Sequence, residues 1–114
     1  MRLDYRELES GVRLIKLSGT LDANGVNQVD VEFVRRCTGD NLCVLVDLSK
    51  VNYISSIGVP LLINSAKALA REGGKMALLK PKKFVEDTLE LMGISLIIPI
   101  YHNFDTAVSE LKKM

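Results

Sequence analysis

The sequence predicts an α/β fold, with a mixed β-sheet of about five strands and about four helices packed on it. Apolar strand-like segments alternate with amphipathic helical segments after an opening hairpin. Residues 42–46 (LCVLV) form a continuous apolar run bounded by turn residues, which is typical of a central strand buried on both faces. With 114 residues and no linker or repeat, the chain is expected to form a single domain over residues 1–114.

Each element follows from the spacing of its apolar residues. Strands are indicated by alternation or by a short apolar run, and helices by apolar residues three and four positions apart. Glycine pairs and polar clusters mark the turns between them. The expected strands cover residues 3–8, 12–17, 42–46, 75–79 and 96–100, and the expected helices cover residues 25–37, 57–72, 82–92 and 104–112.

The helical spacing also predicts which side chains enter the core. Between the strand at residues 42–46 and the second helix, the chain is expected to leave the sheet and form a polar connection over residues 51–56. The expected inward residues are Val26, Val29, Phe33 and Val34; Val59, Leu62, Ile63, Ala66, Leu69 and Ala70; Phe84, Val85, Leu89 and Met92; and Phe104, Ala107, Val108 and Leu111.

Charge and hydropathy argue against several classes of partner. The formal net charge is +1, so no charge excess favours nucleic acid or an anionic membrane. The longest apolar stretch, residues 95–101, is far shorter than the roughly 20 residues that a membrane span needs. The charged N-terminal segment contains no apolar run of the secretory type. We therefore expect a cytoplasmic protein that binds neither nucleic acid nor membrane.

The residues for metal or acid–base chemistry are few. Cys37 and Cys43 are not in a CxxC pattern, and His102 is the single histidine, so neither a metal nor another cofactor is expected. The two cysteines could form a disulfide. The simpler interpretation is that Cys43, at the start of an apolar run, is a buried thiol. Because no serine has a recognisable base, and Gly-x-Ser-x-Gly and Walker loops are absent, the chain is not expected to be an enzyme.

Two serines at the start of the helix expected over residues 57–72 carry the functional prediction. Ser55 and Ser56 precede that helix, and Gly58 permits the close approach of another backbone. Taken alone, Ser56 is explained most simply as an N-cap. On a helical wheel, however, the face away from the core is poor in charge, which is typical of a surface that another protein covers. That face holds Ile57, Leu61, Asn64 and Ala68, with Lys67 and Arg71 on one flank.

Phosphorylation of Ser56 would act as a binding switch. A phosphate adds about −1.5 to −2 charges at neutral pH. The positive end of the helix dipole tolerates this charge, so the fold is expected to survive the modification. An apolar partner docked beside Ile57 and Leu61 would not tolerate it, because the dianion would have to be desolvated.

The residues around these serines resemble a known family. Residues 46–58 (VDLSKVNYISSIG) resemble the central motif of STAS domains, the anti-sigma factor antagonists of bacteria, in which a strand ending in Asp-Leu-Ser leads to an Asp-Ser-x-Gly loop. Residues 17–22 (LSGTLD) are similar to the family's Gly-x-Leu-Asp turn, and residues 91–94 (LMGI) to its closing segment. The resemblance covers essentially the whole chain and implies the STAS-like sheet described above.

The resemblance also implies partners and a cycle. In the family, the unphosphorylated antagonist binds an anti-sigma factor that is a serine kinase, and thereby releases the sigma factor. The kinase phosphorylates the loop serine, and a PPM-type phosphatase reverses the reaction. The matching acceptor here is Ser56, and the implied partner-binding residues are Asp22, Ile57, Gly58, Leu61, Asn64 and Ala68.

One position departs from the family motif. The usual Asp before the acceptor is Ser55 here, and a serine can only form hydrogen bonds where an acid would bring charge. Two alternatives therefore stay open. Either Ser55 is the acceptor, or the domain is a STAS scaffold or accessory subunit, as in stress-signalling or lipid-transport complexes, that binds partners without a phosphoswitch.

Overall fold

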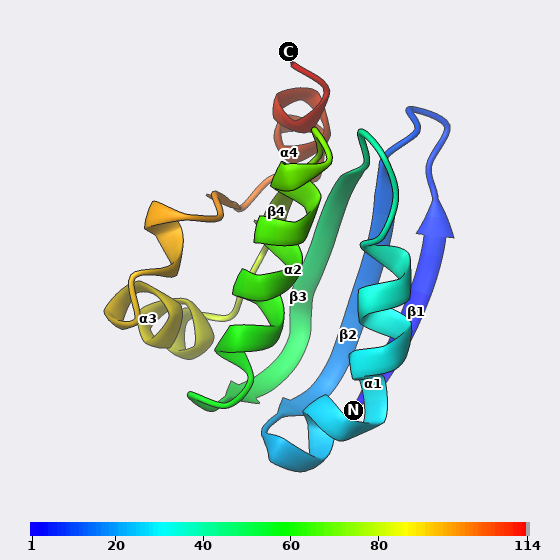
Figure 1. Cartoon of the computed structure of the whole chain (residues 1–114). Coiled ribbons are helices and arrows are strands. Elements are labelled where there is room, and N and C mark those ends of the chain that lie inside the picture. Colours follow the sequence, from blue (N-terminus) through cyan, green and yellow to red (C-terminus); the bar gives the residue numbers. More distant parts are fainter. Residues whose placement is uncertain (114) are drawn as a thin grey trace.

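The computed structural model describes residues 1–113 and forms a five-stranded sheet covered by helices (Figure 1). The strands follow the order β1-β2-β3-β4-β5, with β1 antiparallel to β2 and the other neighbours parallel. This confirms the predicted mixed sheet and α/β class. The elements are β1 (Arg2–Glu7), β2 (Arg13–Leu21), α1 (Ala23–Arg36), β3 (Cys43–Ile54), α2 (Val59–Arg71), β4 (Lys75–Leu79), α3 (Lys83–Leu91), the 3-10 helix η1 (Ile94–Leu96), β5 (Ile100–Tyr101) and α4 (Phe104–Lys112).

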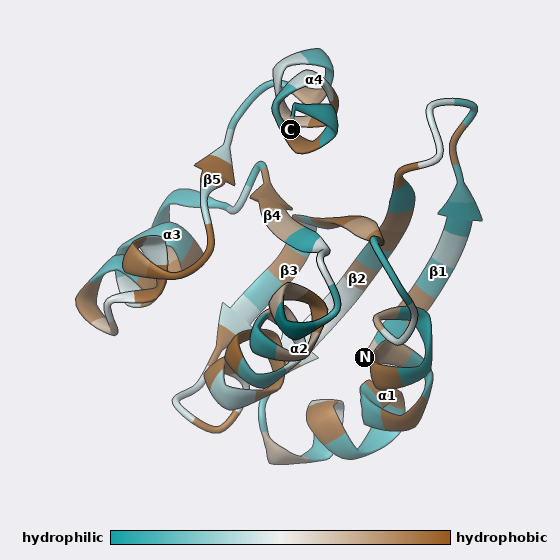
Figure 2. Ribbon diagram, turned by 45° about the horizontal axis from the view of Figure 1, so that its top comes forward, coloured by the Kyte–Doolittle hydropathy of each residue, from teal (hydrophilic) through white to brown (hydrophobic). Residues whose placement is uncertain are grey.

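The helices divide the core into two parts. In Figures 1 and 2, α1 and α2 lie against one face of the sheet and α4 lies against the other. The larger cluster joins α1, α2 and α3 to the sheet and includes Phe33, Leu69 and Leu89. The smaller cluster joins α4 to Leu45 and its neighbours. Because successive strand residues point to opposite faces, the central strand β3 is apolar in every position from Val44 to Val46, as the sequence predicted.

The third strand is longer than expected. The sequence predicts that the chain leaves the sheet after residue 46, whereas β3 continues to Ile54 and pairs with β2 as far as Leu21. Two register shifts in this pairing accommodate the extra residues, and the Asp47 carboxylate accepts a hydrogen bond from the Ser49 N–H at 2.9 Å within the irregular stretch. The polar side chains that indicated a connection instead belong to an irregular, partly exposed strand.

The C-terminal strand is also displaced. Residues 96–100 were expected to form it, but η1 occupies residues 94–96 and β5 contains only Ile100 and Tyr101. Gly93, with a φ of 73°, begins the 3-10 turn, and Pro99 has no N–H to donate to a ladder. The apolar run therefore splits, with Ile94 and Ile98 buried and Leu96 90% exposed.

Several residues predicted to face inward do not. Val34 is 50% exposed, Phe84 is 58% exposed and Met92 is 40% exposed, whereas Phe33, Val85 and Leu89 are buried. Helical spacing selects an arc of positions, but contact with the sheet buries only the middle of that arc. Phe84 instead stacks on Tyr53 at the end of β3, with ring centroids 6.1 Å apart.

The two cysteines are free thiols, so the disulfide alternative is wrong. Cys37 is buried, and Cys43, which was expected to be the buried thiol, is half-buried with its Sγ 3.2 Å from the Leu111 carbonyl oxygen. Burial raises the pKa of the Cys37 thiol to about 12. Within residues 1–113, no helix is both long and apolar enough to cross a bilayer.

The raised pKa makes a labelling prediction. Because the thiolate is the reactive form, Cys37 is expected to resist alkylation at pH 8 in the folded protein and to react fully after denaturation. Iodoacetamide labelling followed by peptide mass spectrometry would measure each thiol separately. A Cys37→Ser variant identifies the signal of Cys43. Rapid labelling of Cys37 in the native protein would contradict its burial.

Candidate docking and phosphorylation site

Ser55 holds the start of the site in place. Its N–H donates to the Leu21 carbonyl at 3.1 Å, and its hydroxyl donates to the same oxygen at 3.4 Å. The Ser55 Oγ also accepts a hydrogen bond from the Ile57 N–H at 3.3 Å. A half-buried side chain that both donates and accepts locally fixes the turn between β3 and α2.

Ser56 lies at the exposed tip of that turn. The Gly58 N–H donates to the Ser55 carbonyl at 3.0 Å, which closes the turn and points residue 56 outward. Within residues 1–113, the Ser56 hydroxyl makes no hydrogen bond. The simple N-cap interpretation of Ser56 is therefore wrong, because α2 begins at Val59 rather than at residue 57 and its N-cap is Gly58, without a side-chain bond.

Asp22 lies next to the Leu21 carbonyl, and its carboxylate already accepts a hydrogen bond within α1. Its carboxylate accepts a hydrogen bond from the Gly25 N–H at 2.9 Å and so caps the N-terminus of α1. The Leu21 carbonyl next to it is the acceptor for Ser55. Asp22 thus lies next to the Leu21 carbonyl that Ser55 contacts, and this hydrogen bond ties the loop after β2 to the loop after β3.

Gly58 is required for this close approach. A Cβ atom at position 58 would lie 2.5 Å from the Leu21 carbonyl oxygen and 2.8 Å from the Leu21 Cγ, both shorter than real contacts. The two loops can meet only because residue 58 has no side chain. The predicted role of Gly58 in permitting a close backbone contact is confirmed, with Leu21 of the same chain as the neighbour.

The exposed face of α2 differs from the helical-wheel prediction. Asn64 is exposed as expected, but Leu61 and Ala68 are half-buried, and Leu61 packs against the larger core. The helix contacts α1 as well as the sheet, which widens its buried arc and also buries Ser65. The exposed residues of the helix are Pro60, Asn64, Lys67, Ala70 and Arg71, so its outer surface carries two cations, and the prediction that Ala70 faces inward is wrong.

Ile57 provides the main apolar contact surface of the site. Its side chain is 55% exposed, next to Ser56 and outside the helix. An exposed aliphatic side chain beside a free hydroxyl suits an interface in which modification of the hydroxyl changes binding. The sequence predicted that Ile57 is exposed, which is confirmed, but placed it on the helix rather than in the turn.

Among residues 1–113, no group of three or more His, Cys, Asp or Glu side chains could hold a metal ion. His102 lies 2.8 Å from the Glu86 carboxylate of α3, and this contact engages neither serine. The arrangement leaves the Ser56 hydroxyl exposed and unbonded within residues 1–113.

The chain is similar to known proteins in both sequence and fold. The sequence profile of the STAS domain matches residues 6–107. The anti-sigma F factor antagonist of Paenibacillus polymyxa is 28% identical over 109 residues, which are 93% of this chain and 92% of that protein. The crystal structure of an anti-sigma factor antagonist from Mycobacterium paratuberculosis has a TM-score of 0.88 and 18% identity, and the match covers 98% of this chain and 94% of the other.

SpoIIAA, an anti-sigma factor antagonist and Bacillus cell-fate determinant, has been solved in two states. Its unphosphorylated form has a TM-score of 0.80 and 17% identity, covering 99% of this chain and 98% of that one. Its phosphorylated form has a TM-score of 0.69 and 16% identity, covering 97% and 100%. At these identities the solved structures establish likeness of fold alone.

Proposed function

Because the chain belongs to the STAS domain family, we propose that it is an anti-sigma factor antagonist that binds an anti-sigma factor in its unphosphorylated form. The family relationship rests on a match over residues 6–107, and the Paenibacillus polymyxa relative carries this role in its name. The partner in this proposal is a serine kinase that modifies Ser56, and a PPM-type phosphatase restores the hydroxyl. The exchange takes place in the cytoplasm, where ATP is available to the kinase.

The contrast between the two serines carries the proposal. Ser56 is exposed and its hydroxyl is unbonded within residues 1–113, whereas the Ser55 hydroxyl is half-buried and used twice. A kinase acting on Ser55 would have to break both bonds and place a dianion against the Leu21 carbonyl. This asymmetry favours Ser56 over Ser55 as the phosphate acceptor. It also gives Ser55 a structural role in the turn, which a serine fills through hydrogen bonds without the charge of an acid.

Phosphate on Ser56 is compatible with the fold. The residue precedes the N-terminus of α2, where the positive end of the helix dipole faces the loop. The same charge opposes an apolar partner that covers Ile57, which is adjacent and 55% exposed. In the proposed cycle, phosphorylation therefore releases the partner without unfolding the antagonist.

The docking surface is tested by substitutions on α2. Asn64→Glu changes an exposed residue, and we expect at least about a tenfold weaker affinity for the cognate anti-sigma kinase, because a buried unpaired charge costs more than 1.4 kcal/mol. Leu61→Lys should act in the same direction. Val31→Lys, on the 80% exposed position of α1, is the matched control. Isothermal titration calorimetry measures the affinities, and circular dichroism checks that each variant is folded.

An unchanged affinity for both α2 variants would exclude this helix as the docking surface. The proposal that the chain is a substrate rather than an enzyme has a separate test, which is incubation of the purified chain with labelled ATP alone. Incorporation of phosphate without the kinase would overturn the proposal that the chain is only a substrate.

The alternative, a STAS scaffold without a phosphoswitch, predicts tight partner binding that modification of Ser56 does not change.

A further inference from the structure

The edge of the sheet at β4 is left open over its first half. β5 pairs only with Leu78 and Leu79, so residues 75–77 have a strand neighbour on one side, β3, and none on the other. In a parallel ladder, successive residues direct their N–H and C=O groups to opposite sides. The Lys75 N–H donates toward β3, to Leu42, and the Leu78 N–H donates toward the β5 side, to Pro99. This alternation places the N–H and C=O of Met76 on the open side.

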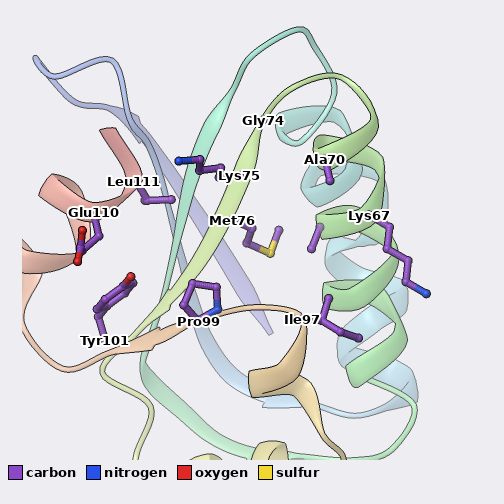
Figure 3. A pocket seen from close by; sticks show the side chains of 11 residues that line it. Lys67, Ala70, Gly74, Lys75, Met76, Ile97, Pro99, Tyr101, Glu110 and Leu111 are labelled. Atoms are coloured by element: carbon purple, nitrogen blue, oxygen red, sulfur yellow. The ribbon is translucent and has the colours of Figure 1, made fainter. Parts of the chain in front are cut away.

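A cleft of about 410 Å³ lies along this open edge (Figure 3). One wall is α2, where Ala66 and Ala70 are small enough to leave room, and the opposite wall is α4. Ile97 and Pro99 close one end of it. The edge of β4 therefore forms the floor of a groove between two helices. The full lining is Ala66, Lys67, Ala70, Gly74, Lys75, Met76, Ile97, Pro99, Tyr101, Glu110 and Leu111.

The two sides of the cleft differ in chemistry. Met76 belongs to the larger core beside α2, and its side of the cleft is lined by apolar groups. The side beside α4 presents the Tyr101 hydroxyl and the Glu110 carboxylate. A strand laid along β4 would send alternate side chains to these two sides, so an aliphatic residue would face α2 and a polar residue would face α4.

The charges around the cleft favour an acidic occupant. Glu110 is paired with Lys113 at 2.9 Å, so its carboxylate is already neutralised. Lys75 lines the cleft on the side of α4, whereas Lys67 lies at the α2 rim with its side chain directed away from the floor (Figure 3). Within residues 1–113 neither is paired with a carboxylate; Lys75 donates only to the Lys113 carbonyl. Among the residues that line the cleft, Lys67 and Lys75 therefore lack a carboxylate partner, and the one acidic residue, Glu110, has a cationic partner.

We propose that this cleft binds an extended acidic segment of a partner protein, which adds to the sheet as a further strand beside β4. Main-chain hydrogen bonds to Met76 give affinity in this mode, and alternating acidic and aliphatic side chains give specificity. A second folded copy of the domain fits less well, because its own covering helices would meet α2 and α4 before its strand edge reached the floor of the groove. The inference does not depend on the Ser56 switch, and each can fail alone.

The open edge can be tested first in the free protein. Hydrogen exchange followed by NMR should show the Met76 amide exchanging at least about tenfold faster than the Lys75 and Ala77 amides, since only the latter two face β3. Protection of Met76 equal to that of its neighbours in dilute solution would overturn the proposal. Protection that appears only on raising the protein concentration would assign the edge to a second copy and would also overturn it.

The ligand class is then tested with the peptide Ac-Glu-Val-Glu-Val-Glu-NH2. We expect saturable binding that protects the Met76 amide. Three changes should each weaken binding at least about tenfold. N-methylation of the peptide removes its backbone N–H donors, Lys75→Glu reverses the charge that attracts the glutamates, and Ala70→Trp fills the cleft. Lys50→Glu and Ala23→Trp are matched controls at exposed positions away from the cleft. Equal binding by the N-methylated peptide or by a Lys-Val-Lys-Val-Lys peptide would refute the strand addition or the acidic preference.

Discussion

Ser56→Ala is expected to reduce phosphate incorporation by the cognate anti-sigma kinase to background, whereas Ser55→Ala is expected to remain a substrate. The Ser56 hydroxyl is exposed and unbonded within residues 1–113, while the Ser55 hydroxyl bonds to Leu21 and Ile57. Loss of these bonds should lower the free energy of unfolding of Ser55→Ala by about 1 kcal/mol, without removing the acceptor. Phosphopeptide mass spectrometry measures the site, and urea unfolding measures the stability.

The two variants distinguish the open alternatives. If phosphate appears on Ser55 of the wild-type chain, the assignment of the acceptor is wrong, although the family role stands. If the kinase binds the chain but modifies neither serine, the scaffold alternative is correct. Ser56→Asp completes the series: it should weaken kinase binding at least about tenfold while leaving the unfolding free energy within about 1 kcal/mol, because a charge at this position faces a helix N-terminus.

The residues of the candidate site follow from residue types and motif, whereas the local structure around them does not. Ser56, Ile57 and Gly58 were identified from residue types and motif, and the structure places them in one turn, with Ser56 and Ile57 exposed and Gly58 buried against Leu21. The start of α2 was misplaced by two residues because Ser55 and Ser56 have the composition of an N-cap. The tie between Ser55 and the Leu21 carbonyl joins residues 34 positions apart, so local spacing contained no signal for it.

The errors in the predicted fold have a common cause, which is contact between elements that are distant in the sequence. The extension of β3 to Ile54 depends on irregular pairing with β2, which alternation within β3 alone does not reveal. The half-burial of Leu61 depends on α1 lying beside α2, and the helical wheel treats a helix as touching only one surface. The regular features, such as the apolar run at residues 42–46, were predicted correctly because their burial follows from their own sequence.

Phe33→Ala is expected to be among the most destabilising single substitutions in the chain. The side chain is fully buried in the larger core, at 0% exposure, where α1 packs on the sheet. Truncating a buried Phe to Ala costs about 3–5 kcal/mol through lost burial and the resulting cavity. That loss approaches the whole stability of a domain whose unfolding free energy is of the ordinary 5–15 kcal/mol. Urea unfolding should show a large fall in the midpoint, with an unchanged slope if unfolding stays two-state.

Two neighbours on the same helix provide controls. Val31 is 80% exposed, so Val31→Ala should lower the free energy of unfolding by no more than about 0.5 kcal/mol. Val34→Ala is the sharper control, because helical spacing places Val34 in the core with Phe33 whereas the structure leaves it 50% exposed. A loss for Val34→Ala close to that for Phe33→Ala would mean that α1 is rotated from the orientation described. A small loss would mean that contact with the sheet, rather than periodicity, decides which face of α1 stabilises the fold.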